Sequence, residues 1–254
     1  MISLEGLQSF YDQNRFLEAF RQSMESWKPS QRLEQLSADE LIFGGRLAVR
    51  LGGRRLSRRL FRTALARDPS NARVRYFTWG LRRRGWKLFD DLRSWEVQPE
   101  LPDADVNTQA SWLASQAVTW ASFRDFRRAH ACIERAKSLE TKESWVFSCE
   151  SDVFGLEDRW DEALKSAEIS WEMNPGTPYG AHSLGNSLLN LRRIREAAER
   201  LSCAAQGCES FEVAQLTCWH VCTLAEIVEG EERGRTLQRA EELAEQASKL
   251  YTAS

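Results

Sequence analysis

Three residues near the C-terminal end carry side chains that bind metals. Cys218 and Cys222 are four residues apart, and His220 lies between them. On a helix the two cysteines share a face, whereas His220 projects about 200° away, because a helix turns once every 3.6 residues. Adding Cys203 and Cys208 would require a second helix to approach with suitable geometry, and zinc sites usually show tighter Cys and His spacing. The pattern therefore favours buried thiols over a metal site.

Other residues with reactive side chains are equally poorly placed for catalysis. His130 and Cys132 are too close along one helix to face each other as a base and a nucleophile. The pairs Gly44–Gly45 and Gly52–Gly53 fall at a helix-packing position and a hairpin turn, so neither makes a phosphate-cradling loop. We therefore expect no enzyme activity, no catalytic residue, no metal and no cofactor.

The composition is that of a soluble globular protein. The chain has 254 residues, 35 Lys plus Arg against 37 Asp plus Glu, and 42% hydrophobic residues. No run of 18 apolar residues exists, which excludes a membrane span. The first residues lack a basic start followed by an apolar run, so we expect no secretory signal, six reduced cysteines and a cytoplasmic location.

The chain contains an internal repeat of 34 residues. Ala129, Ala163 and Ala197 are separated by 34 residues and again by 34. A large apolar residue stands three positions before each of these alanines. Apolar or small residues stand four and seven positions after each alanine. This 3-4-3 spacing describes one face of an α-helix.

The segment before each of these helices repeats as well. Small residues recur at the same period, and a bulky residue follows each by three positions: Ala117, Ser151 and Gly185, then Trp120, Phe154 and Leu188. Small residues let two helices approach closely. Each unit is thus a helical hairpin that must stack on its neighbours to cover its apolar faces.

The repeat extends to both ends of the chain. Pro69 and Pro175 close equivalent helices and are 106 residues apart, which is three periods plus the four residues of a connector at Gln98–Asp103. We predict an all-α array over residues 1–254 with about seven hairpins, near 1–30, 38–71, 72–99, 110–143, 144–177, 178–211 and 212–254. The unit from Ala72 has a short second helix near Trp86–Trp95. The last unit has a loop at Glu229–Gly234 before a helix from Thr236 to Leu250.

These features resemble the tetratricopeptide repeat (TPR) family. Its pattern has small residues at unit positions 8, 20 and 27, met here by Gly185, Ala197 and Ala204. The sequence departs from that pattern where Gln116 and Glu150 replace a usual leucine, and where proline is missing after Ala136 and Ala204. The resemblance implies antiparallel helix pairs in a right-handed superhelix, whose inner groove is lined by the first helix of each pair.

Family geometry also implies which side chains line that groove. The early units contribute basic and aromatic residues, Arg46, Val49, Arg50, Arg73, Tyr76, Arg83 and Arg84; the later units contribute Trp145, Ser148, Asp152, Tyr179, His182, Asn186, Asn190 and His220. Our hypothesis is that the arginines attract acidic segments and the later residues set specificity. The alternative is that many of these residues form a solvated face, and that Trp145 and Tyr179 pack on a neighbouring unit.

The best-known peptide site of the family is not reproduced. It clamps a C-terminal carboxylate with Lys, Asn and Arg, whereas Ala114, Val118, Ser148 and Asp152 stand at those positions here. We therefore predict a non-catalytic scaffold for another protein or peptide, with an unspecified partner and oligomeric state. The alternative is a regulatory or targeting module of a larger enzyme or complex.

A second alternative is nucleic-acid binding. Residues 46–93 hold 15 basic and three acidic residues, and arginine binds phosphate and carboxylate in a bidentate manner. Against this, the overall charge is −2 and no nucleic-acid reader motif is present. Several arginines are predicted to lie on a second helix, facing outward, where they would pair with acids or contact another domain: Arg54, Arg55, Arg58, Arg59 and Arg62.

Overall fold

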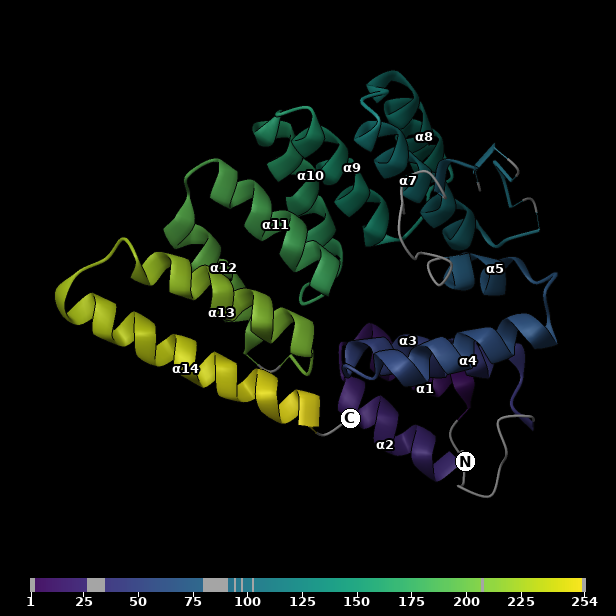
Figure 1. Ribbon diagram of the computed structural model, residues 1–254, viewed down its shortest axis with the longest axis horizontal. Coiled ribbons are helices and arrows are strands. Elements are labelled where there is room, and N and C mark those ends of the chain that lie inside the picture. The colour runs from purple at the N-terminus through teal and green to yellow at the C-terminus, as the bar shows by residue number, and fades with distance from the viewer. Residues whose placement is uncertain are drawn as a thin grey trace. The chain divides into compact units, whose positions relative to one another are not determined.

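The computed structural model describes residues 3–26, 35–79, 91–93, 95–96, 98–101, 103–206 and 208–252 (Figure 1). Every regular element in these ranges is a helix, which confirms the all-α prediction. Within the same ranges no helix combines the length and the apolar character that a membrane crossing requires.

Consecutive helices pack against each other as hairpins. The hairpins pair α1 (Leu4–Asp12) with α2 (Phe16–Ser26), α3 (Ala38–Arg50) with α4 (Arg54–Arg67), α7 (Val106–Ser122) with α8 (Phe126–Ser138), α9 (Ser144–Leu156) with α10 (Trp160–Met173), and α13 (Phe211–Ala225) with α14 (Gly230–Thr252). In addition, α5 (Ala72–Trp79) packs on α7, and α11 (Pro178–Asn190) is followed by α12 (Ile194–Ala205).

The chain divides into two compact bodies. Residues 1–70 and 198–254 form one, which we name the terminal body, and residues 71–197 form the other, the central body. The first boundary falls at the start of the weak repeat unit that begins at Ala72. Each body has its own apolar core: Leu7, Phe16, Phe43 and Leu47 belong to that of the terminal body.

The positions that carry the repeat are buried as stacking requires. Ala129, Ala163 and Ala197 are fully buried. In the central body, Ala129 and Ile133 of α8 share a cluster with Val146 and Val153 of α9, so one hairpin packs directly on the next. Close packing of small residues against a neighbouring hairpin explains why the sequence repeats their type and spacing.

Most predicted helix starts are correct, and a side-chain cap is present at three of the four, α9 being the exception. α3, α5, α9 and α11 begin at the predicted residues. The Ser37 hydroxyl and the Glu40 carboxylate form a capping box at the start of α3. α7 begins four residues earlier than predicted, because the Asp105 carboxylate accepts a hydrogen bond from the Thr108 backbone N–H at 3.0 Å.

The prediction for the last helix was wrong at its start. α14 begins at Gly230 rather than Thr236, so most of the predicted loop at Glu229–Gly234 is helical. Glu231 and Glu232 lie in its first turn, where carboxylates interact favourably with the helix dipole. In the weak unit, residues 91–93 and 95–96 are helical, and the remainder of the predicted Trp86–Trp95 helix lies outside the described residues.

The turn inside most hairpins repeats its backbone conformation. One residue of this turn has a positive φ in five of the hairpins: Asn14 at 58°, Gly52 at 85°, Arg124 at 63°, Asp158 at 61° and Arg192 at 61°. In the last hairpin the corresponding residue, Glu226, has a φ of −73° instead. A left-handed residue lets the chain leave one helix and enter the next with no intervening loop. Outside glycine this conformation costs about 1–2 kcal/mol.

Arg192→Gly should therefore stabilise the protein. Relief of the left-handed strain outweighs the extra entropy of glycine in the unfolded chain, and we expect a gain of about 0.5 kcal/mol in the free energy of unfolding. Urea denaturation would measure it. Lys165→Gly, in the middle of α10, is the control and should lose about 1 kcal/mol. A loss for both variants would contradict the strain argument.

Candidate functional site

The first helices of three successive hairpins adjoin one another in the central body. α9 packs on α7 on one side and on α11 on the other. Trp145 of α9 and Tyr179 of α11, which are 34 residues apart, meet edge to face with ring centroids 5.2 Å apart. This contact confirms the alternative prediction that Trp145 and Tyr179 pack on a neighbouring unit. The indole Nε1 of Trp145 is buried and, among the described residues, has no hydrogen-bond acceptor.

Asp152 lies two turns after Trp145 on the same face of α9. Its side chain is half-buried, and no hydrogen-bond or ion-pair partner for its carboxylate occurs in the described part of the chain. Burial raises the pKa of Asp152 from the usual 3.8 to about 7. The carboxylate also contributes, after burial itself, to the raised pKa of the Cys149 thiol one turn away. Asp152 is thus an acidic group that has no compensating cation among the described residues.

Three further predicted residues continue this face on α11. His182 is exposed, Asn186 is half-buried and Asn190 is exposed. The Asn190 side-chain amide donates to the Asn186 backbone oxygen at 2.9 Å and to its side-chain oxygen at 3.2 Å. One pair of amide groups is therefore held in a fixed orientation on the surface. We name Trp145, Asp152, Tyr179, His182, Asn186 and Asn190 the first-helix face.

Two predicted residues are not accessible. The Ser148 hydroxyl is buried at 2.8 Å from the Ser170 hydroxyl of α10, so it joins the two helices of its own hairpin. His220 is only 1% exposed, whereas its neighbour Trp219 is 52% exposed. The predicted orientation of α13 was therefore wrong: it placed His220 on the accessible side of the helix, whereas Trp219 is the exposed residue.

The predicted arginines of α3 are engaged within the terminal body. Arg50 forms an ion pair with Glu212 at 2.8 Å and donates to the Tyr11 hydroxyl at 3.1 Å. The Arg46 guanidinium lies over the Tyr11 ring, 4.5 Å from its centroid. Burial alone would raise the pKa of Tyr11, but Arg50 and Arg46 together lower it. Arg50 already has an acidic partner in Glu212. Its contacts therefore do not favour the predicted role of binding an acidic segment of another protein.

The remaining early residues lie elsewhere. Arg73 is half-buried on α5. Tyr76 contacts Trp112 edge to face at 6.4 Å, within a cluster that includes Trp79 and Trp95, and burial raises the pKa of its phenol. Arg83 and Arg84 lie outside the described residues.

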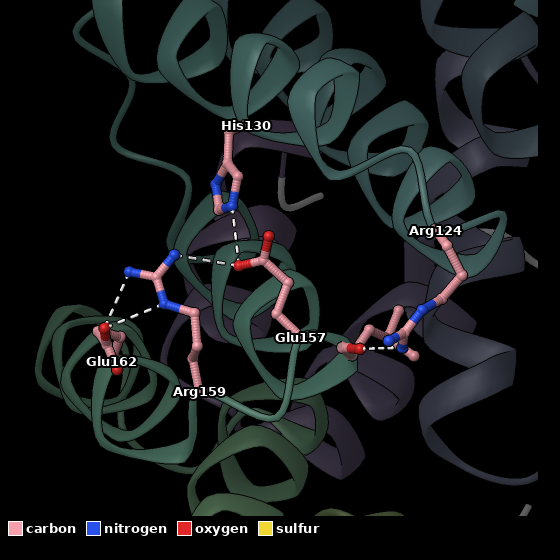
Figure 2. Close-up of polar contacts among 6 residues, drawn as sticks. Arg124, His130, Glu157, Arg159 and Glu162 are labelled. Atoms are coloured by element: carbon pink, nitrogen blue, oxygen red, sulfur yellow. Dashed lines mark hydrogen bonds and ion pairs between the residues drawn. The ribbon is translucent and has the colours of Figure 1, made fainter.

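A polar network at the hairpin turns links α8 to the next hairpin (Figure 2). The His130 ring lies 3.0 Å from the Glu157 carboxylate, which also binds Arg159 at 3.1 Å. Arg159 in turn binds Glu162 at 2.8 Å. The Arg124 guanidinium donates to the backbone oxygen of Leu156. No nucleophile contacts His130 among the described residues, so we interpret the network as a tie between stacked repeats.

The cysteines do not gather into a metal site in the described structure. Cys132, Cys149 and Cys208 are buried, and none of the six forms a disulfide. The expectation of buried thiols is wrong for the other three, because Cys203 and Cys222 are exposed and Cys218 is half-buried. The described residues contain no cluster of three or more His, Cys, Asp or Glu side chains able to hold a metal ion.

Comparisons with known proteins address the fold. No family profile and no curated protein matches the sequence. Among solved structures, a tetratricopeptide repeat protein from Parabacteroides merdae aligns over 98% of this chain and 96% of its own, with 13% identity and a TM-score of 0.48. IFIT1, solved with Gppp-AAAA, aligns over 97% of this chain and 60% of its own, with 14% identity and a TM-score of 0.50. Yeast Tom70 aligns over 90% of this chain and 50% of its own, with 15% identity and a TM-score of 0.41.

The stacked hairpins and their 34-residue period define the class of protein: the chain has a TPR-like helical repeat fold. The alignment with IFIT1 agrees with this fold. At these identities the comparisons show the fold alone, and the partner has to be argued from the side chains of this chain.

Proposed function

We propose that the protein is a non-catalytic scaffold that binds a protein or peptide on the first-helix face of the central body. This is the face that lines the inner groove in a TPR superhelix. It combines an aromatic pair, fixed amide groups and one carboxylate. Aromatic side chains supply contact area at low entropy cost, and amides bond to a peptide backbone.

The observation that carries the proposal is the uncompensated Asp152 carboxylate. A half-buried acid with no partner in the described chain costs stability. A lysine or arginine of a bound partner would pair with it and recover that cost. The preferred partner therefore carries a basic residue opposite Asp152, which differs from the acidic segment expected from the arginines of α3.

A peptide array probed with the purified protein would test this proposal. We expect the bound peptides to be enriched in Lys or Arg next to an apolar residue. Asp152→Asn should weaken their binding by about tenfold or more, and Tyr179→Ala should weaken it as well. Lys165→Gln, on the second helix α10, is the matched surface control and should bind normally.

The pH dependence of binding offers an independent check. The pKa of Asp152 in the unbound protein is raised to about 7. The affinity for a basic peptide should therefore rise as the pH increases through that value, because the carboxyl group becomes charged. Asp152→Asn should remove this rise in affinity. Peptides that bind wild type, Asp152→Asn and Tyr179→Ala equally would overturn the proposal.

A further inference from the structure

The second helix of the terminal body's α3–α4 hairpin carries a row of exposed arginines. Arg54, Arg55, Arg58, Arg59 and Arg62 are all exposed on α4. At 100° per residue they span an arc of about 140° on one side of the helix. None of the five guanidinium groups has a hydrogen-bond or ion-pair partner in the described chain. The expectation that they pair with acids is therefore not met among the described residues. We name these five residues the arginine face.

This arrangement is unfavourable for the helix itself. Arg54 and Arg55 lie in the first turn, where the helix dipole repels cations, and α4 has no acidic residue there. Its N-cap, Gly53, supplies no side-chain acceptor. Three pairs of arginines are also four residues apart, a spacing at which like charges repel. The helix forms because its other side buries Leu60, Phe61 and Ala64.

The chemistry of the arginine face favours phosphate over the alternatives. Arginines at i and i+4 lie about 6 Å apart along the helix, which is similar to the spacing of phosphates along an extended nucleic-acid strand. The one large exposed apolar residue of α4, Leu56 at 47% exposure, lies outside the arc. Insertion into a membrane or burial in a protein–protein interface would need apolar side chains on this face. Phosphate binding needs only cations.

We propose that the arginine face of α4 binds the phosphate backbone of a nucleic-acid strand without reading its sequence. The guanidinium groups make bidentate contacts with the phosphate oxygens. This surface lies in the terminal body and is independent of the first-helix face.

Fluorescence anisotropy with a labelled oligouridylate, measured over a range of salt concentrations, would test the proposal. Wild type should bind with a strong salt dependence. The variant R54Q/R55Q/R58Q/R59Q/R62Q should bind at least about tenfold more weakly at low salt, and the slope of log affinity against log salt should fall by about 3. The control R21Q/R127Q/K142Q/R233Q/R235Q removes five positive charges from exposed positions elsewhere and should bind like wild type.

The other probes are a duplex DNA, a polyglutamate peptide and vesicles containing phosphatidylserine. Binding of RNA or DNA that depends on the arginine face supports the proposal. The proposal is overturned if wild type binds neither nucleic acid. It is also overturned if the arginine-face variant and the control variant lose nucleic-acid affinity to the same extent. Tighter binding of polyglutamate or vesicles than of nucleic acid at the same salt also overturns it.

Folding of the five-site variant is checked by circular dichroism. It should be retained, because glutamine is a good helix former and the like-charge repulsion is removed. R54Q/R58Q, which removes only two charges, is the second variant, and its salt slope should fall by about 1. An unchanged slope in this variant would likewise count against the proposal.

Discussion

Asp152→Asn is expected to raise the free energy of unfolding by about 2–4 kcal/mol at about pH 8, and to change it little at about pH 3. The pKa of Asp152 is about 7 in the folded protein against an ordinary value of 3.8. Each pKa unit corresponds to about 1.4 kcal/mol, so a shift of this size corresponds to about 4 kcal/mol at most. The lower bound allows for the fact that the side chain is only half-buried.

The sign follows from proton binding. Below the ordinary pKa the carboxyl group is protonated in both states and costs nothing. Between the two pKa values the folded protein binds more protons than the unfolded chain, so stability falls as the pH rises. Above about 7 both states are ionised and the full cost remains. Asparagine resembles the neutral acid in shape, so the variant avoids this loss.

Urea denaturation of both proteins across this pH range measures the effect. The difference in unfolding free energy should increase from acid to neutral pH and then level off. Asp161→Asn, at an exposed position of α10, is the control and should not show that profile. A difference that is flat across the range would mean that Asp152 is solvated in the folded protein.

This prediction also concerns function. A residue that lowers stability without a partner in the described chain is typical of a binding site, because proteins accept a stability cost where activity requires it. The same substitution should therefore stabilise the free protein and weaken partner binding. A purely structural role for Asp152 would produce the first effect without the second.

The periodic part of the fold could be predicted from sequence. Ala129, Ala163 and Ala197 share one buried environment because each lies at the contact between stacked hairpins, and such contacts restrict residue size strongly. Helix starts were predictable where a cap or proline marks them, as at Ser37 and Pro178. The start of α14 was not, since the glycines at 230 and 234 suggested a loop.

The candidate site was predictable only in part. The alternative that Trp145 and Tyr179 pack on a neighbouring unit is confirmed, because equivalent residues of neighbouring units meet across the stack. The repeat period could not show that Ser148 would turn toward α10, or that Arg50 would pair with Glu212, which is 162 residues away. Such long-range partners depend on how the chain folds back, and no local pattern encodes that.

Two of the departures from the TPR pattern, the polar residues at leucine positions, have a physical explanation in the structure. Gln116 donates from its side-chain amide to the Pro99 backbone oxygen at 2.6 Å. The buried Glu150 carboxylate binds the Lys137 ammonium at 2.9 Å and accepts from the Ser166 hydroxyl at 3.0 Å. Both residues stand where leucine is usual, and both use polar partners from neighbouring segments in place of apolar packing.

Lys137→Met should accordingly destabilise the protein by about 2–3 kcal/mol, because it leaves the buried Glu150 carboxylate without its cation. The estimate is below the full cost of breaking a buried pair, since the Lys137 side chain is 34% exposed. Burial lowers the pKa of Lys137, but Glu150 raises it more, and the net shift is upward. The stabilisation is therefore complete below the ordinary lysine pKa and is lost as the pH rises past the folded value.

The double variant Lys137→Met/Glu150→Leu restores the usual leucine and should be at least as stable as wild type, since replacing both partners of a buried pair by apolar groups is often neutral or stabilising. Lys249→Met, which breaks an exposed pair with Glu245, is the control and should cost less than about 0.5 kcal/mol. Denaturation of the four proteins measures the coupling. If the double variant were as unstable as Lys137→Met, Glu150 would be filling a space that leucine cannot, and the pair would be required by the stacking of the hairpins.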